Sequence, residues 1–280
     1  MAEKPIESMG PAPHLRGMLD PRLIEINPDL PPLDDDARAA IAALARRQAD
    51  ARGLVMTAIS FVGGRVEGAL SVLPKPLRKQ FDKAVRKALA RSYDLAGRSR
   101  GGMGEHLAGD RTHRVMAAVT GAVGGVGGIV TALAELPVAT TVIFRAVQDV
   151  AESYGEDTTS EETRLECLSV FGAGGPGDAD DGIDTSFVGA RLALTGSAVN
   201  TMIARVAPRF AAMMGQKLAT QSVPLLGAAA GVGTNLAFTT YYVEMAHVHF
   251  GLRRLMRVYG EEAVTGHFHA VLDKRRLPRG

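Results

Sequence analysis

The sequence predicts an all-α fold, a single helical domain of about seven helices. Ala and Gly are abundant, runs of β-branched residues are few and Trp is absent, and this composition favours closely packed helices over sheets. Hydrophobic residues make up 46% of the 280 residues and charged residues 22%, as in an ordinary folded protein with a substantial core. Two uncharged stretches lead into long helical patterns, so we expect two glycine-rich helix hairpins at the centre of the domain.

The composition divides the chain into an arm and a domain. Seven of the fourteen prolines fall in residues 1–33. Because proline fixes φ and removes a backbone donor, we expect an extended N-terminal arm there. Three aspartates at 34–36 then supply a helix N-cap and complement the helix dipole. Helical spacing continues to about Leu73, and residues 34–280 are expected to form the helical domain.

The segment after Pro74 predicts a basic amphipathic helix. Its apolar residues Leu77, Phe81, Val85 and Leu89 recur every four positions and form one stripe. The residues that are candidates for contact with a membrane surface are Lys75, Arg78, Lys79, Lys83, Arg86, Lys87 and Arg91. Two interpretations stand. Either the stripe of a surface helix packs on the protein core, or the helix lies on an anionic lipid surface with its stripe toward the lipid.

Residues 115–134 carry no charge over twenty positions, which is long enough to cross a bilayer. Their glycines weaken a helix but let two helix backbones approach closely. We expect a helix to about Gly124, a break, and a second helix from about Ile129 to Ser153, ended by a C-cap at Gly155. The stretch has three interpretations: a transmembrane span, a buried helix crossing, or a hairpin that a peripheral protein presents to a membrane.

A second uncharged stretch, residues 222–243, also leads through a GVG step into a long helix, which ends in the triplet YGE at 259–261. A shift of 105 positions places the YGE triplet at 154–156 on that one. Either an internal duplication or a shared Ala/Gly-rich composition explains this likeness.

Residues 158–171 predict a short capped helix. Thr159 or Ser160 is its expected N-cap, and two glutamates follow in the first turn. The next residues, 172–186, predict a flexible acidic loop. Its aspartates lack the glycine position and the closing glutamate of an EF-hand, so no calcium site is expected.

Motifs that would identify an enzyme are scarce. GxxxxGK[ST], HExxH and CxxC do not occur, and no glycine cluster has the strand–helix context of a dinucleotide site. We therefore assign no catalytic residue and expect no cofactor. The weak metal candidates are Glu244 and His247, which share a helix face but lack the further ligands of a di-iron bundle. The remaining C-terminal histidines are expected to be structural or on the surface.

Glu135 is the most unusual polar residue, because it interrupts an apolar run two positions before Pro137. A buried carboxylate must be paired, protonated or solvated, since an unpaired one costs several kcal/mol. Either it is a polar clamp between helices, bonded for example to Asn235, or it binds a ligand or proton. The candidate binding residues are Glu135, Thr140, Thr141, Arg145 and Asn235.

Charge and cysteine content limit partners and compartment. The chain has 32 basic and 30 acidic residues, which gives no case for nucleic-acid binding. Its one cysteine, Cys167, excludes an internal disulfide and fits a reducing compartment. No secretory signal pattern opens the sequence, so we expect a cytoplasmic location.

Three segments carry a family resemblance. The first runs from GAVGGVGG through ELPVATTVIFR to the YGED end, the second is TRLECLSVFGAGG, and the third is PLLGAAAGVGTNLAFTTYYVEMAHVHFGLRRLMRVYG. Together they resemble the EcsC family of bacterial proteins over roughly residues 37–265. More loosely, they are similar to the membrane-associated helical domain of some Era-like GTPases, although no GTPase domain is present.

The resemblance implies a role beside an ABC transporter involved in secretion and competence, and the family also carries a protease label. We expect a non-enzymatic, peripheral membrane-associated accessory protein at the inner face of the cell membrane. Its expected partners are an anionic membrane surface or a membrane transporter. Two alternatives remain, a module that binds a lipid or other apolar ligand, and a hydrolase with Glu135, Asp149 and Glu244 as its best candidates.

Overall fold

The structure is a computed structural model that describes residues 30–61, 75–98, 128–173, 196–221 and 227–276. The chain separates into two units, Met1–Pro31 and Pro32–Gly280. All the described helices belong to the second, here called the helical unit. Residues 1–29 of the predicted N-terminal arm and the acidic loop beyond residue 173 lie outside the described residues, while residues 30–33 are described and are not helical.

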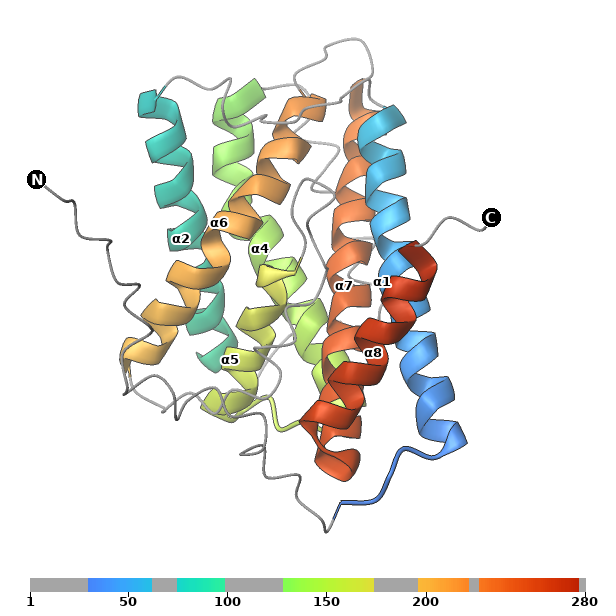
Figure 1. Cartoon of the computed structure of the whole chain (residues 1–280). Helices are drawn as coiled ribbons and strands as arrows, with labels where there is room; N and C mark the ends of the chain where they lie inside the picture. The colour runs from blue at the N-terminus through green and yellow to red at the C-terminus, as the bar shows by residue number, and fades with distance from the viewer. Residues whose placement is uncertain (1–29, 62–74, 99–127, 174–195, 222–226, 277–280) are drawn as a thin grey trace, which may run out of the picture. The chain divides into compact units, whose positions relative to one another are not determined.

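Within the described ranges the helical unit contains seven α-helices, one short 3-10 helix and no strand, which confirms the predicted all-α fold (Figure 1). In chain order these elements are α1 (Asp35–Phe61), α2 (Lys75–Arg98), α4 (Gly128–Ser153), α5 (Glu161–Ser169), η3 (Val170–Gly172), α6 (Gly196–Gln221), α7 (Gly227–Tyr259) and α8 (Glu261–Arg276). None of the helices in these ranges combines the length and the hydropathy that a membrane crossing requires.

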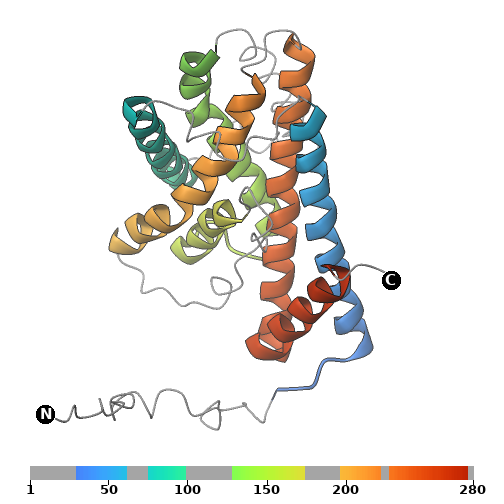
Figure 2. The ribbon, with the colours of Figure 1, turned by 45° about the horizontal axis from the view of Figure 1, so that its top comes forward.

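The long helices α2, α4 and α7 run in the same direction. Tyr93, late in α2, lies under Arg164 of α5, which follows α4. Glu156, just after α4, reaches Arg257 at the end of α7. Helix α1 runs the opposite way along α7, so that the C-terminal end of α1 lies with the N-terminal ends of the other three, as Figures 1 and 2 show.

An aromatic cluster connects α4, η3, α6 and α7 in the middle of the helical unit. Phe171 of η3 stacks on Phe144 of α4 and Tyr242 of α7, with ring centroids 5.9 and 5.3 Å apart. Its edge meets Phe210 of α6 at 5.1 Å. All four rings are fully or nearly fully buried. Offset and edge-to-face pairs of this kind add about 0.5–1.5 kcal/mol each to the burial of their area.

Gly251 sets the close approach of α1 and α7. A Cβ atom at this position would lie 2.8 Å from Cδ2 of Leu44 on α1. The glycine therefore leaves the space that the Leu44 side chain fills, and both residues are buried. Close helix contact through glycine was expected in the uncharged stretches, whereas the structure also places it here, in a charged part of α7.

The two long glycine-rich helices end alike, as the sequence predicts. Gly155 after α4 and Gly260 after α7 have φ of +81° and +83°, values that side chains disfavour. At α4 the amides of Gly155 and Glu156 donate to the carbonyls of Glu152 and Ala151, which is a Schellman motif. At α7 the Gly260 amide donates to the Met256 carbonyl, the simpler left-handed cap.

Several predicted boundaries are confirmed and one is wrong. Helix α4 begins at Gly128, one residue from the expected start, and ends at Ser153 as expected. Ser160 is the N-cap of α5, and its hydroxyl accepts from the Thr163 amide. Helix α7 instead begins at Gly227, so the GVG step at 231–233 lies inside the helix rather than before it. The glycine-rich hairpins expected ahead of α4 and α7 fall largely outside the described residues.

Candidate functional site

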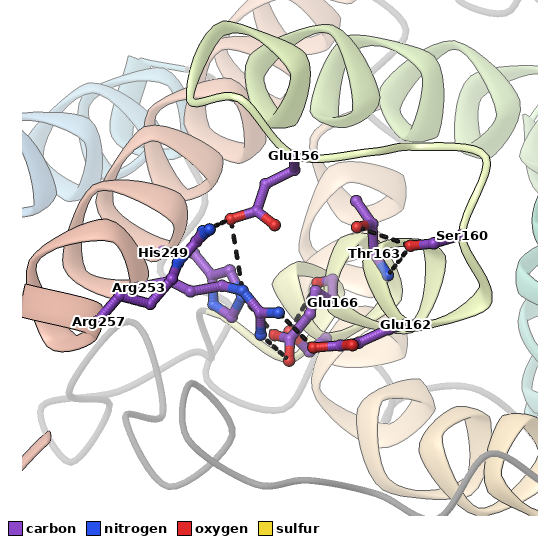
Figure 3. Close-up of polar contacts among 9 residues, drawn as sticks. Glu156, Ser160, Glu162, Thr163, Glu166, His249, Arg253 and Arg257 are labelled. Carbon is purple, nitrogen blue, oxygen red and sulfur yellow. Dashed lines mark hydrogen bonds and ion pairs between the residues drawn. The ribbon is translucent and has the colours of Figure 1, made fainter.

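Arg253 of α7 lies at the centre of a cluster of carboxylates (Figure 3). Its Nη1 donates to Oε1 of Glu166 at 2.7 Å, and its Nη2 donates to Oε1 of Glu162 at 2.5 Å, both on α5. Its Nε faces Oε1 of Glu156 at 3.4 Å, an ion pair without a hydrogen bond. One guanidinium thus connects α7 to α5 and to the turn after α4.

Two further residues of α7, Arg257 and His249, complete this cluster. Arg257, one turn after Arg253, pairs with Glu156 through its Nη2. His249, one turn before it, is buried, and its Nε2 lies 2.7 Å from Oε2 of Glu166. Both oxygens of the buried Glu166 are therefore engaged. We call the six residues the Arg253 cluster: Glu156, Glu162, Glu166, His249, Arg253 and Arg257.

The Arg253 cluster follows from matching stripes on two helices. Glu162 and Glu166 are four positions apart on α5, and their partners His249, Arg253 and Arg257 on α7 also recur at four-residue spacing. Residues at that spacing share one face of a helix. The sequence analysis missed this cluster, although the complementary stripes are visible in the sequence, because no local signal says that α5 faces α7.

Helix α5 is held on its other side by α2. The Arg164 guanidinium lies 4.9 Å from the centroid of the Tyr93 ring, a cation–π contact. Burial raises the pKa of the Tyr93 phenol above its ordinary value, and this is the largest effect on it. The charge of Arg164 acts in the opposite direction and lowers the pKa. The nine residues of α5 therefore connect α2 and α4 with α7 through ion pairs, hydrogen bonds and the Tyr93 contact.

The weak metal candidates contact other partners. Glu244 pairs with Nε of Arg47 on α1. His247 Nδ1 lies 3.4 Å from the Tyr154 hydroxyl, and the two rings meet edge to face. Burial is the main cause that raises the pKa of Tyr154. Among the described residues, no three His, Cys, Asp or Glu side chains are placed to hold a metal ion.

The basic helix α2 has its apolar stripe in the core. Phe81, Val85 and Leu89 are buried and belong to the main hydrophobic cluster. The interpretation with the stripe toward lipid is therefore wrong, and the surface-helix interpretation is correct. All seven predicted membrane-surface residues are exposed: Lys75, Arg78, Lys79, Lys83, Arg86, Lys87 and Arg91. We call them the α2 basic face.

The residues around Glu135 are partly described. Its backbone belongs to α4, but its side chain, and with it the predicted contact to Asn235, lies outside the described part of the chain. Asn235 is buried in α7. Thr140 and Thr141, two of the candidate binding residues, donate to the carbonyls of Leu136 and Pro137 at 2.6 and 2.7 Å, so their hydroxyls satisfy local backbone groups.

Thr141 also bonds Ser92 of α2 at 3.2 Å, and Arg145 is half-buried on α4. The structure does not gather these candidates with the Arg253 cluster. The latter lies at the other end of α4 and on α5 and α7.

The sequence also contains one GxSxG match, GRSRG at 97–101. In serine hydrolases this pattern forms a sharp turn between a strand and a helix. Here the residues before the serine are the last turn of helix α2, which ends at Arg98. The serine and the two residues after it lie outside the described part of the chain.

Comparison with known proteins identifies the family. The model of the EcsC protein family matches residues 79–255, well over half of the chain. The chain belongs to the EcsC protein family. No curated protein and no solved structure matches it.

The EcsC match covers most of the α2 basic face and most of the Arg253 cluster. It begins at Lys79 and ends two residues after Arg253. It therefore contains most of the α2 basic face and five residues of the Arg253 cluster, and it excludes Arg257, Lys75 and Arg78.

Proposed function

We propose that this EcsC family chain is a non-enzymatic accessory protein that attaches peripherally to an anionic membrane surface, at the inner face of the cell membrane. The α2 basic face carries the proposal. Its seven cations are exposed on one helix, and the same helix has two carboxylates, Asp82 and Asp94. No ion pair joins any of the seven to another described residue.

The attraction of such a face to anionic lipid is large enough for reversible binding. Each Lys or Arg near an anionic leaflet contributes about 1 kcal/mol, and the attraction falls off within one Debye length. Because Phe81 and Val85 keep the apolar stripe in the core, the helix attaches by charge rather than by insertion. Binding should therefore be reversible and sensitive to salt.

The accessory role rests on the family rather than on geometry. The EcsC resemblance implies proximity to an ABC transporter or secretion system, and a protein held at the membrane by charge is suited to such a partner. The Arg253 cluster supports a non-enzymatic role, since its carboxylates are engaged by arginines and a histidine.

Vesicle flotation tests the proposal. The purified chain is mixed with vesicles of phosphatidylcholine alone, or of phosphatidylcholine with phosphatidylglycerol, at about 0.1 M and about 1 M salt, where the Debye length is ~10 and ~3 Å. The proposal expects flotation with the anionic vesicles at the lower salt and its loss at the higher. No flotation with anionic vesicles, or equal flotation with neutral ones, would refute it.

A further inference from the structure

We infer that the helical unit docks on anionic phospholipid end-on, with the N-terminal end of α2 and the C-terminal end of α1 toward the membrane. This rests on the proposed function and adds an orientation to it. We call this the basic–apolar end and define it by Leu54, Met56, Lys75, Arg78 and Lys79. The other end of the unit faces the solution.

The contacts between helices place these residues at one end. Helix α1 is antiparallel to α7, since Asp34 meets Tyr259 while Arg47 meets Glu244. Helices α2 and α4 are parallel to α7, as described above. The last turns of α1 and the first turns of α2 therefore lie at the same end, on opposite sides of α4 and α7 (Figures 1 and 2).

The basic–apolar end combines exposed apolar and cationic side chains. Leu54 and Met56 on α1 are 43% and 49% exposed, and near the opposite end Val258 and Leu95 are 49% and 37% exposed, so it is the combination with cations that sets this end apart. Lys75, Arg78 and Lys79 on α2 are also exposed. Apolar side chains beside lysine and arginine are the composition of protein surfaces that enter the lipid headgroup region.

Few of the described acidic residues lie near this end, and the nearest on α1 is the exposed Asp50, one helical turn before Leu54. Helix α7 has no Asp, Glu, Lys, Arg or His from 227 to 243, and α4 has none from 128 to 134. The first carboxylate of α2 is Asp82, which is half-buried. An anionic surface can therefore approach this end without strong repulsion.

The opposite end is acidic. Its exposed carboxylates come from the start of α1, the end of α4, the start of α5 and the start of α8: Asp35, Asp36, Glu152, Asp157, Glu162, Glu261 and Glu262. They outnumber the exposed arginines described there, Arg38, Arg254 and Arg257, although Glu162 is paired with Arg253. Repulsion between these carboxylates and anionic lipid opposes docking by this end. The helical unit is thus electrically asymmetric along its helices, and the asymmetry favours one orientation.

End-on docking differs measurably from docking along the side of α2. Helix α2 rises about 1.5 Å per residue, so Arg91 lies about 24 Å further from the membrane than Lys75 if the helix stands upright. That distance exceeds the Debye length of ~10 Å at 0.1 M salt. End-on docking uses the first cations of α2, whereas side-on docking uses all of them.

Matched triple variants separate the two orientations. We compare K75Q/R78Q/K79Q with R86Q/K87Q/R91Q, which remove the same charge from the same exposed helix face. End-on docking predicts that the first triple weakens binding to phosphatidylglycerol vesicles on the order of 100-fold and the second only a few-fold. Equal losses, or a larger loss for the second triple, would overturn the orientation while leaving membrane attachment intact.

Fluorescent labels provide an independent measurement. A nitrobenzoxadiazole label at Met56→Cys should shift to the blue and be quenched by doxyl lipids in the same vesicles. The same label at Ala263→Cys, exposed in the first turn of α8, should do neither. The wild-type chain, whose Cys167 is buried, controls for unwanted labelling. A lipid signal at 263, or none at 56 from protein that floats, contradicts the orientation, and a failure of the wild type to float refutes both proposals.

Discussion

Arg253 forms ion pairs with three glutamates, two on α5 and one in the turn after α4. Replacing Arg253 with Ala leaves Glu166 and Glu156 with fewer cations while both stay largely covered. Removing one partner of a buried ion pair typically destabilises a protein by about 3–5 kcal/mol. We expect a loss of this size in the free energy of unfolding from urea titration.

The neighbouring arginine provides the matched control. Arg254 is exposed on the same helix, and an exposed surface substitution usually changes stability by less than about 0.5 kcal/mol. Arg254→Ala should therefore be close to the wild type. Equal effects of the two variants would show that the Arg253 cluster adds little to stability.

Gly251 predicts a steric effect that runs against helix propensity. Gly→Ala in a helix normally stabilises by up to about 1 kcal/mol, and Gly266→Ala on α8, where no atom lies within 4 Å of the new Cβ, should do so. Gly251→Ala should instead destabilise by about 1 kcal/mol or more, because its Cβ meets the buried Leu44. Thermal unfolding of both variants measures the contrast, and a stabilised Gly251→Ala would contradict the close helix contact.

At the scale of elements, the start of α1 predicts a dependence on pH. Asp34 accepts from the Ala37 amide at 2.7 Å and from the Tyr259 hydroxyl at 2.8 Å. The Ala37 amide, and then the Tyr259 hydroxyl, lower the pKa of Asp34 below its ordinary 3.8. A lowered pKa stabilises the fold above the unfolded value, and this contribution is lost as the pH falls through the folded value.

Asp34→Asn should therefore lower the melting temperature near neutral pH, and the difference from the wild type should shrink as the pH falls below about 4. Asp35→Asn is the control, since the Asp35 side chain is fully exposed. A difference that grows on acidification would contradict the sign of this argument.

Some elements follow from sequence periodicity and others do not. The stripe through Phe81, Val85 and Leu89 predicts helix α2 and its apolar face, because that information lies within one helix. Only the structure shows that this face packs on the core rather than on lipid. The glycine after α4 likewise predicts the end of that helix. Local patterns failed at α7, where glycines at 231 and 233 suggested a start, yet the helix already begins at Gly227. Glycine lowers helix propensity by only about 1 kcal/mol per residue, so it need not end or begin a helix.

The polar sites were harder to predict because their partners are distant in sequence. Glu166 and His249 are 83 positions apart, and Arg47 and Glu244 are 197 apart. Nothing within a helix specifies such pairs. The sequence analysis therefore considered Glu244 with His247 as a metal pair by their local spacing, whereas the structure gives each a partner on another element. The basic residues of α2 were found because exposure needs no partner.

At the scale of the whole molecule, the net charge conceals how the cations are distributed. The formal net charge is +2, yet seven cations share one face of α2. Replacing all seven with Gln should abolish flotation on phosphatidylglycerol vesicles. Replacing Arg46, Lys274 and Arg275, exposed cations outside α2, should leave flotation unchanged within a few-fold. If the second variant loses binding as the first does, attachment follows total charge and not the α2 basic face.

The Arg253 cluster also has a consequence for the order of folding. Its carboxylates and cations are separated by more than 80 positions, so the loop between them must close before any pair forms. We therefore expect these pairs to be absent from the folding transition state. Substitutions at Arg253 should then increase the unfolding rate with little change in the folding rate. The cluster would therefore stabilise the native state mainly by slowing its unfolding.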